Sequence, residues 1–455
     1  MDRNTRIAIL GGGPAGLSAA MYLEKKGYEN YTVFEKNNRV GGKCYSPKYK
    51  DGRAYEMGAI MGCPTYFAVQ EVMDFTGYGV DGPALVRQYK NKDGKVIDPF
   101  STKNVLNLPH LLRMKNHVKK LCKLLQTKYV GYDINGHRGI SQGRYDGYAA
   151  TKEHQKVSGE NPNLKDLMLP FDEFCRINGV EGVKDLWIGP YTSFGYGYFD
   201  EIPAAYVLKY LDFDTMMDFM YLRLWTWKDG TQSIWDHLND KLKHPALLNQ
   251  EVTKVERHDG KVYITAGNEA PKEFDKLIVT TPLPYFAEYA DASAAEKELF
   301  SKIDYERYDS MAVEMKPENI PDTSYYIFEN MQPERLGHLM VYYKRWKTDD
   351  KNQPITTYTL RNHKGQKVLD YEGTKKQVLE DLKTMSNPAE NVILECENYY
   401  FPHIFTEDYQ AGWYEKVEGM QGENNTFYAG EIMSFGDMEE VAEYSRDLVE
   451  RFFAD

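Results

Sequence analysis

A glycine-rich turn near the start of this 455-residue chain constrains its fold more than any other feature. Gly11, Gly13 and Gly16 follow the apolar run 7–10, which is typical of a parallel strand buried on both faces. The G-x-G-x-x-G spacing permits a tight turn, lets a pyrophosphate approach the backbone and lets the next helix pack closely on the strand. The sequence therefore predicts a strand-turn-helix unit that binds a nucleotide.

The residues after the turn complete this unit. Apolar residues within 17–23 recur at helical spacing, Gly27 can end the helix, and residues 31–34 are predicted to form the second strand. Glu35 closes that strand about twenty residues after the glycines, where an acidic side chain can accept hydrogen bonds from a ribose diol. A lone glycine motif is weak evidence, but strand, helix and distal acid in this order indicate a β-α-β nucleotide site.

The next segment indicates which nucleotide is bound. Arg39-Val40-Gly41-Gly42-Lys43 resembles the R-x-G-G-[RK] signature of the flavin-containing amine oxidoreductase superfamily, in which the arginine and the paired glycines lie near the diphosphate of FAD. The resemblance implies that FAD is the cofactor. The residues assigned to cofactor binding in this region are Gly11, Gly13, Ala15, Gly16, Glu35, Lys36, Arg39, Gly42 and Lys43.

A second fingerprint of the same superfamily lies far along the chain. Residues 426–431, T-F-Y-A-G-E, combine a short strand with a glycine and an acid, and a helix capped by Asp437 is predicted to end near residue 453. In the superfamily this helix directs its N-terminus at the flavin, where it stabilises the negative charge that appears on reduction. The resemblance assigns Gly430, Glu431, Met438 and Glu439 to the cofactor.

Further cofactor contacts are implied between the two fingerprints. Gly58-Ala59 corresponds to a G-A element that lies beside the isoalloxazine ring in the superfamily, where a small residue lets the backbone touch the flat ring. A plain glycine-rich turn is the alternative. The strand that begins at Val252 resembles the one that carries the adenine contact, and Trp413 is a candidate to pack near the ring.

These returns to one cofactor predict an α/β fold like that of the amine oxidases. It comprises a discontinuous Rossmann-like FAD-binding domain, a helical cap and a mixed α+β substrate domain. The FAD-binding domain is expected to comprise 1–70, 225–285 and 396–455, the mainly helical cap or lid 71–224, and the sheet-bearing substrate domain 286–395. Strands are predicted over 252–255, 262–264, 274–282, 310–315 and 355–360, and a helix over 375–385.

Charge and cysteine usage exclude several classes of protein. The formal net charge of -12 argues against a nucleic-acid partner, because a phosphate-binding surface needs a basic field. The five cysteines are scattered and lack a C-x-x-C pair, which favours reduced thiols and a cytoplasmic location. The histidines show no metal-binding spacing, so no metal site is expected. The sequence contains no apolar run of about twenty residues, so no transmembrane segment is expected.

A basic amphipathic helix is predicted over 108–129. Its apolar residues recur at helical spacing, and the remainder carries lysine and arginine without any acidic residue. One interpretation is a peripheral contact with anionic lipid or attraction of a carboxylate substrate; the other is the solvated face of a packed helix. The polar segment 136–163 is predicted to be an insertion or surface loop.

The middle of the chain resembles one branch of the superfamily. The stretches GRAYEMGAIMG, FGYGYFDEIPAAYVLKYLDF, LWTWKDGTQ and ERLGHLMVYYKRW are similar to the bacterial polyunsaturated fatty acid double-bond isomerases, the linoleate isomerases that form conjugated linoleic acid. The resemblance implies a free polyunsaturated fatty acid as substrate. It also implies that a hydride passes from a 1,4-diene to FAD and returns at another carbon, so no catalytic side chain is expected.

Substrate-binding residues follow from the same resemblance. Arg87 falls where that family carries its carboxylate-binding arginine, and arginine suits the role because it is bidentate and always charged. Phe194 and Tyr196 are candidates to cover the entrance or line the channel. Two other functions stay open: a FAD-dependent amine or polyamine oxidase or other lipid desaturase or oxidase, and a non-catalytic FAD-dependent scaffold or lipid-binding protein.

Overall fold

The computed structural model describes residues 2–129, 161–347 and 349–453. Its helices are α1 (Pro14–Lys25), α2 (Phe67–Thr76), α3 (Leu108–Thr127), α5 (Phe171–Asn178), α6 (Lys184–Thr192), α7 (Ala204–Tyr210), α8 (Phe213–Met220), α9 (Gln232–Lys241), α10 (Leu283–Tyr289), α11 (Ala294–Phe300), α12 (Tyr371–Thr384), α13 (Thr406–Gln410), α14 (Trp413–Gly419) and α15 (Met438–Phe452). Its strands are β1 (Ile7–Leu10), β2 (Tyr31–Phe34), β3 (Arg87–Lys90), β4 (Val96–Ile97), β5 (Val252–His258), β6 (Lys261–Ala266), β7 (Lys272–Phe274), β8 (Lys276–Val279), β9 (Asp304–Met315), β10 (Ser324–Tyr326), β11 (Val341–Tyr343), β12 (Ile355–Leu360), β13 (Ala389–Cys396), β14 (Tyr399–His403) and β15 (Thr426–Tyr428).

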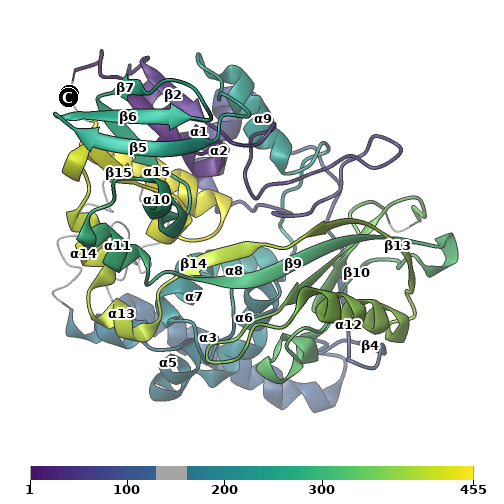
Figure 1. The fold of residues 1–455 in the computed structure, drawn as a ribbon. Coiled ribbons are helices and arrows are strands. Elements are labelled where there is room, and N and C mark those ends of the chain that lie inside the picture. The colour runs from purple at the N-terminus through teal and green to yellow at the C-terminus, as the bar shows by residue number, and fades with distance from the viewer. Residues whose placement is uncertain (1, 130–160, 348, 454–455) are drawn as a thin grey trace.

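A parallel sheet in the order β15-β8-β1-β2 joins segments that are far apart in the sequence. The strand β1 lies inside this sheet and is buried along its whole length. Helices α1 and α15 pack against each other beside the sheet, where the Ser445 hydroxyl donates to the Ala15 carbonyl (2.9 Å). The two predicted fingerprints therefore meet in one sheet (Figure 1).

A small antiparallel sheet, β5-β6-β7, leads the chain back to the parallel sheet. The predicted strands at 252–255 and 262–264 are confirmed as β5 and β6. The strand predicted over 274–282 is divided, because Asp275 interrupts it between β7 and β8. The Asp275 carboxylate accepts the backbone N–H of Arg6 (2.7 Å) and forms an ion pair with Lys261. These polar contacts hold Asp275 in the break between the two strands.

A larger mixed sheet has the order β13-β9-β12-β11-β10-β3-β4, and β14 pairs with a further part of β9. The predicted strands at 310–315 and 355–360 and the helix at 375–385 are confirmed as β9, β12 and α12. In Figure 1 the long strand β9 and its shorter partner β14 run across the middle of the molecule, with the parallel sheet above them and helices α3, α5 and α7 below.

Two parts of this sheet differ from the predicted organisation. Strands β3 and β4 belong to it, although they lie within the segment predicted as a mainly helical cap. The β3 sequence R-Q-Y-K has no apolar alternation, so its pairing with β10 and β4 makes it a strand. Strand β14 pairs with β9, although it lies in a segment assigned to the FAD-binding domain. The domain boundaries themselves stay a prediction.

The helical part below the mixed sheet contains α3 and α5 to α8. The predicted basic helix is confirmed as α3, which buries Met114, Leu121 and Leu125 on one face. Most of the predicted polar insertion, 136–160, lies outside the described residues. In the described part of the chain, no helix combines the length and the apolar character needed to cross a bilayer.

Candidate active site

The glycine turn forms the floor of a cavity of about 640 Å³ at the carboxyl ends of the parallel strands. A Cβ at Gly16 would lie 1.9 Å from the Gly11 carbonyl oxygen, so the start of α1 touches the turn backbone. No side chain caps α1, which leaves its N-terminal N–H groups for a ligand. Gly11, Gly13 and Ala15 line the cavity, while Gly16 packs behind it.

Glu35 is held at one end of the cavity. Its carboxylate accepts the backbone N–H of Gly12 (2.8 Å) and both the backbone and side-chain N–H of Asn37 (2.8 and 2.7 Å). A carboxylate has about four acceptor positions, so a further donor such as a ribose hydroxyl can still be accommodated. Lys36 and Val252 line the same cavity, and their contact with the nucleoside stays a prediction.

The two fingerprints are joined by an ion pair across the cavity. The Lys43 ammonium lies 2.5 Å from the Glu431 carboxylate, and both side chains are partly exposed to the cavity. Arg39 also lines the cavity, and its guanidinium donates to the carbonyl of Gly42 (2.9 Å) and stacks over the ring of Tyr45. Arg39 therefore shapes the turn that follows β2, and Gly42 and Gly430 border the same space.

The segment that carries Gly58-Ala59 lies directly against this turn. A Cβ at Gly58 would lie 1.7 Å from the Lys43 carbonyl oxygen, so no larger residue fits there. The backbone N–H of Met57 donates to the Tyr45 carbonyl (2.9 Å). Gly58 and Ala59 both border the cavity, which places backbone rather than a long side chain at this wall.

Aromatic side chains that pack on one another form a wall of the cavity. Tyr196 packs against Tyr210 and Tyr400, with ring centroids 5.0 and 5.6 Å apart, and its hydroxyl donates to the Gly436 carbonyl (3.2 Å). Burial raises the pKa of the Tyr196 phenol well above its ordinary value, so it stays neutral at physiological pH. The aromatic residues that line the cavity are Phe34, Tyr45, Tyr66, Phe194, Tyr196, Tyr210, Tyr285, Tyr289, Tyr305, Tyr308 and Tyr400.

Besides Gly16, three residues predicted for the site do not border the cavity. Glu439 follows Met438 on α15 and points about 100° away from it, so its carboxylate instead accepts the N–H groups of Ala68 and Val69 (both 2.9 Å). The Trp413 indole is buried and donates to the Leu299 carbonyl (2.8 Å). Met438 itself lines the cavity, at the end of α15 that Asp437 caps.

Arg87 is the third such residue, and Phe219 lies between it and a residue that lines the cavity. Its guanidinium donates to the Phe219 carbonyl (2.7 Å) and lies 5.7 Å from the ring centroid of Tyr326. The Phe219 ring packs on Phe194, which does line the cavity, with centroids 5.8 Å apart. Phe219 thus contacts both Arg87, the predicted anchor, and Phe194, the predicted gate.

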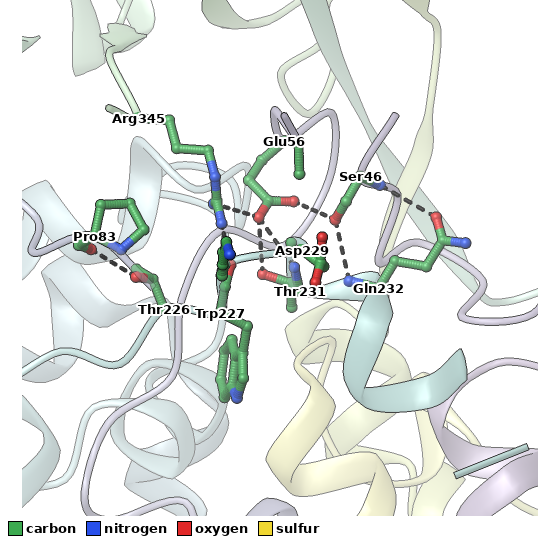
Figure 2. Close-up of polar contacts among 12 residues, drawn as sticks. Ser46, Glu56, Pro83, Thr226, Trp227, Asp229, Thr231, Gln232 and Arg345 are labelled. Atoms are coloured by element: carbon green, nitrogen blue, oxygen red, sulfur yellow. Dashed lines mark hydrogen bonds and ion pairs between the residues drawn. The ribbon is translucent and has the colours of Figure 1, made fainter. Parts of the chain in front are cut away.

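A buried charge cluster beneath the Gly58-Ala59 segment was not predicted. Glu56 is fully buried, and its carboxylate accepts from the Arg345 guanidinium (2.5 Å), the Ser46 hydroxyl (2.5 Å) and the backbone N–H of Thr231 (3.0 Å). Figure 2 shows the Glu56 carboxylate between Arg345 on one side and Ser46 on the other. Arg345 also donates to the Trp227 carbonyl.

This cluster ties the cavity wall to three separate parts of the chain. Burial raises the pKa of Glu56, and the Arg345 charge opposes that rise. The partners lie 10, 175 and 289 residues from Glu56, which is why no local motif reveals them. Glu56, Thr231 and Arg345 lie in three of the strings that carry the family resemblance, GRAYEMGAIMG, LWTWKDGTQ and ERLGHLMVYYKRW, but nothing in these strings indicates that they meet.

Comparisons with known proteins place the chain in a family. The model of the family described as flavin containing amine oxidoreductase matches residues 14–440. The chain belongs to this family. Its cofactor is FAD. The uncapped α1 N-terminus, the close backbone approach at Gly16 and the acid Glu35 fit the diphosphate and ribose of that cofactor.

The chain is similar to several individual members of known function. A crystal structure of a CLA-producing fatty acid isomerase from P. acnes has a TM-score of 0.90 and 50% identity, and the match covers 100% of both chains. The polyenoic fatty acid isomerase of Ptilota filicina is 26% identical over 312 residues, which are 62% of this chain and 57% of that protein. Putrescine oxidase bound to putrescine, at 15% identity, a TM-score of 0.67 and coverage of 98% and 97%, shares the fold.

Proposed function

We propose that the chain is a FAD-dependent isomerase that moves a double bond of a free polyunsaturated fatty acid, converting a linoleate-like 1,4-diene into a conjugated diene. The similarity to a CLA-producing isomerase over the whole of both chains carries this proposal. The cavity agrees with it, because both FAD fingerprints border the same space as a wall of aromatic side chains.

When bound, FAD supplies reversible hydride acceptance, which is the chemistry that a shift of a double bond along an acyl chain requires. The protein must then hold the diene in place and exclude water. The buried rings of Tyr196 and Tyr210 and the partly buried ring of Tyr400 provide an apolar surface, and their faces stabilise positive charge on a carbon skeleton. With their pKa values raised by burial, these phenols are not bases at neutral pH.

Arg87 is proposed as the anchor of the fatty acid carboxylate. Among the described residues it forms no ion pair, and it is only partly buried, so its charge can serve an incoming carboxylate. The contacts of Phe219 with both Arg87 and Phe194 support a path from the anchor past Phe194 to the aromatic wall. Phe194 and Tyr196 would then act as gate and channel lining.

One anaerobic assay tests the reaction. The FAD-loaded protein is incubated with linoleic acid and no electron acceptor, and conjugated diene is followed by ultraviolet absorbance. Diene formation with the flavin oxidised at the end supports the isomerase. In a parallel aerobic incubation with putrescine, oxygen consumption and peroxide formation, without diene formation from linoleate in the anaerobic assay, would favour the amine oxidase alternative that the shared fold leaves open.

We also propose a cytoplasmic location. All five cysteines are free, and Cys44, Cys63 and Cys175 are buried, so the fold does not depend on disulfides. Expression in a reducing host with full thiol titration under denaturing conditions should give five thiols per chain. Disulfide-linked protein isolated from its natural source under alkylating conditions would contradict this location.

A further inference from the structure

Four large apolar residues are exposed at the start of α3. Leu106 is 87% exposed, Val105 74%, Leu112 60% and Leu108 37%. They lie within eight residues of sequence, so they form one apolar tip (Val105, Leu106, Leu108 and Leu112) rather than scattered surface residues. A cluster of this kind on a protein surface indicates contact with another apolar phase.

A row of lysines continues from this apolar tip along the same side of α3. Lys115, Lys119 and Lys123 are exposed, and their spacing from Leu112 follows the three- and four-residue steps that keep side chains on one face of a helix. The buried residues of α3, Met114, Leu121 and Leu125, lie on the opposite face. We call the three residues the lysine row.

The lysine row has no countercharge in the part of the chain that the structure describes. No acidic residue occurs in 99–129, and none of the three lysines forms an ion pair with a described residue. The ion pairs of this helix, His110 with Asp185 (3.9 Å) and Lys128 with Asp166 (2.8 Å), lie on its flanks. Within the described residues the lysine row therefore stays unneutralised, on a protein of net charge -12.

We infer that α3 docks on an anionic lipid surface. The apolar tip enters the boundary between headgroups and acyl chains, and the lysine row contacts the phosphates, as in helices that lie in the plane of a membrane interface. A second copy of the chain fits less well, because a two-fold contact through this face would bring the two lysine rows together. The docking would hold the enzyme where free fatty acids partition; that link to substrate rests on the proposed function, whereas the docking does not.

Vesicle sedimentation of the FAD-loaded full-length protein tests the inference. We expect binding to phosphatidylcholine vesicles that contain phosphatidylglycerol, weaker binding at high salt and little binding to phosphatidylcholine alone. The triple variant K115Q/K119Q/K123Q should lose affinity by on the order of a hundredfold, since each lysine near the surface contributes about fivefold. The double variant L106S/L112S should also bind poorly, because the apolar insertion is lost.

Matched controls separate the effect of this surface on vesicle binding from the effects of total charge and of exposed apolar side chains in general. The variant K297Q/K367Q/K376Q removes the same charge from exposed lysines elsewhere, and Val368→Ser removes an apolar side chain that is 40% exposed. Both should bind vesicles like the parent protein.

Equal losses in test and control variants would overturn the inference, as would the absence of vesicle binding by the parent. Dimerisation that disappears in L106S/L112S without vesicle binding would assign the surface to a second copy instead. Isomerase activity on dissolved fatty acid is measured in parallel, so that failure of docking and failure of the proposed reaction are distinguished.

Discussion

The parallel sheet and the mixed sheet border the same cavity but contribute to it in different ways. The parallel sheet presents backbone: Gly11, Gly13 and Gly430 follow its strands. The mixed sheet presents side chains, such as Tyr308 from β9 and Tyr400 from β14. A backbone surface suits a cofactor whose phosphates bind N–H groups, and a side-chain surface suits an apolar substrate. The substrate part can therefore change without altering the cofactor part.

The largest expected effect comes from a methyl group in the backbone surface. Gly16→Ala would place a Cβ 1.9 Å from the Gly11 carbonyl oxygen, so the turn or α1 must move and FAD binding should be lost. The flavin content of the purified protein, measured by visible absorbance, checks this. Gly419→Ala is the control, because nothing lies within 4 Å of its Cβ position. A yellow Gly16→Ala protein with normal flavin content would contradict the account of the turn.

The buried Glu56 cluster, which ties the Gly58-Ala59 segment to distant parts of the chain, should give the next largest effect. Arg345→Met leaves Glu56 buried without its charged partner, which should lower the free energy of unfolding by about 3 to 5 kcal/mol. Urea denaturation measures this loss. The double variant E56Q/R345M removes both charges and should recover part of the stability. If the double variant is less stable than Arg345→Met alone, the paired charges are not what the cluster requires.

A pH effect is expected at the edge of the parallel sheet. Burial by itself would raise the pKa of Glu296, but hydrogen bonds from Arg257 and Tyr428 lower it to about 2. The ordinary value in the unfolded chain is 4.5, so this carboxylate stabilises the fold above pH 4.5 and the contribution is lost as the pH falls toward 2.

The contribution amounts to at most about 3 kcal/mol. The Glu296→Gln variant should therefore be less stable than the parent at pH 7 and should show a flatter dependence of stability on pH between 4.5 and 2. Thermal unfolding at a series of pH values checks both statements. Parallel curves for variant and parent over that range would assign the acid sensitivity to other carboxylates.

The smallest expected effect concerns a single side chain of the mixed sheet. Arg87→Ala should raise the KM for free fatty acids by roughly tenfold to a hundredfold, the value of one charge-assisted hydrogen-bonding contact, and should leave the KM for methyl esters nearly unchanged. Steady-state kinetics with both substrates measures the ratio. Arg335→Ala, which removes a partly buried arginine elsewhere, serves as control. Equal effects on acid and ester would remove Arg87 from the anchor role.

The sequence predicted the parts of the site that depend on backbone conformation. Gly11, Gly13, Glu35, Gly58 and Gly430 all border the cavity, because tight turns and close contacts restrict the residue type and leave a visible motif. The aromatic wall was predicted only in part. Tyr196 was named, but Tyr210 and Tyr400 were not, since the chain has 36 tyrosines and nothing local distinguishes those that face the cavity.

Local sequence thus determined the nucleotide-binding unit of this protein, its cofactor, and those helices and strands whose apolar residues recur with a clear period. Tertiary structure decided the rest: that β3 is a strand, that Glu439 turns away from the cavity, and that Arg345 reaches Glu56 from 289 residues away. The physical reason is the range of the interactions. Glycine turns and helical spacing act between near neighbours, whereas strand pairing and buried charge pairs depend on segments that meet only in the folded chain.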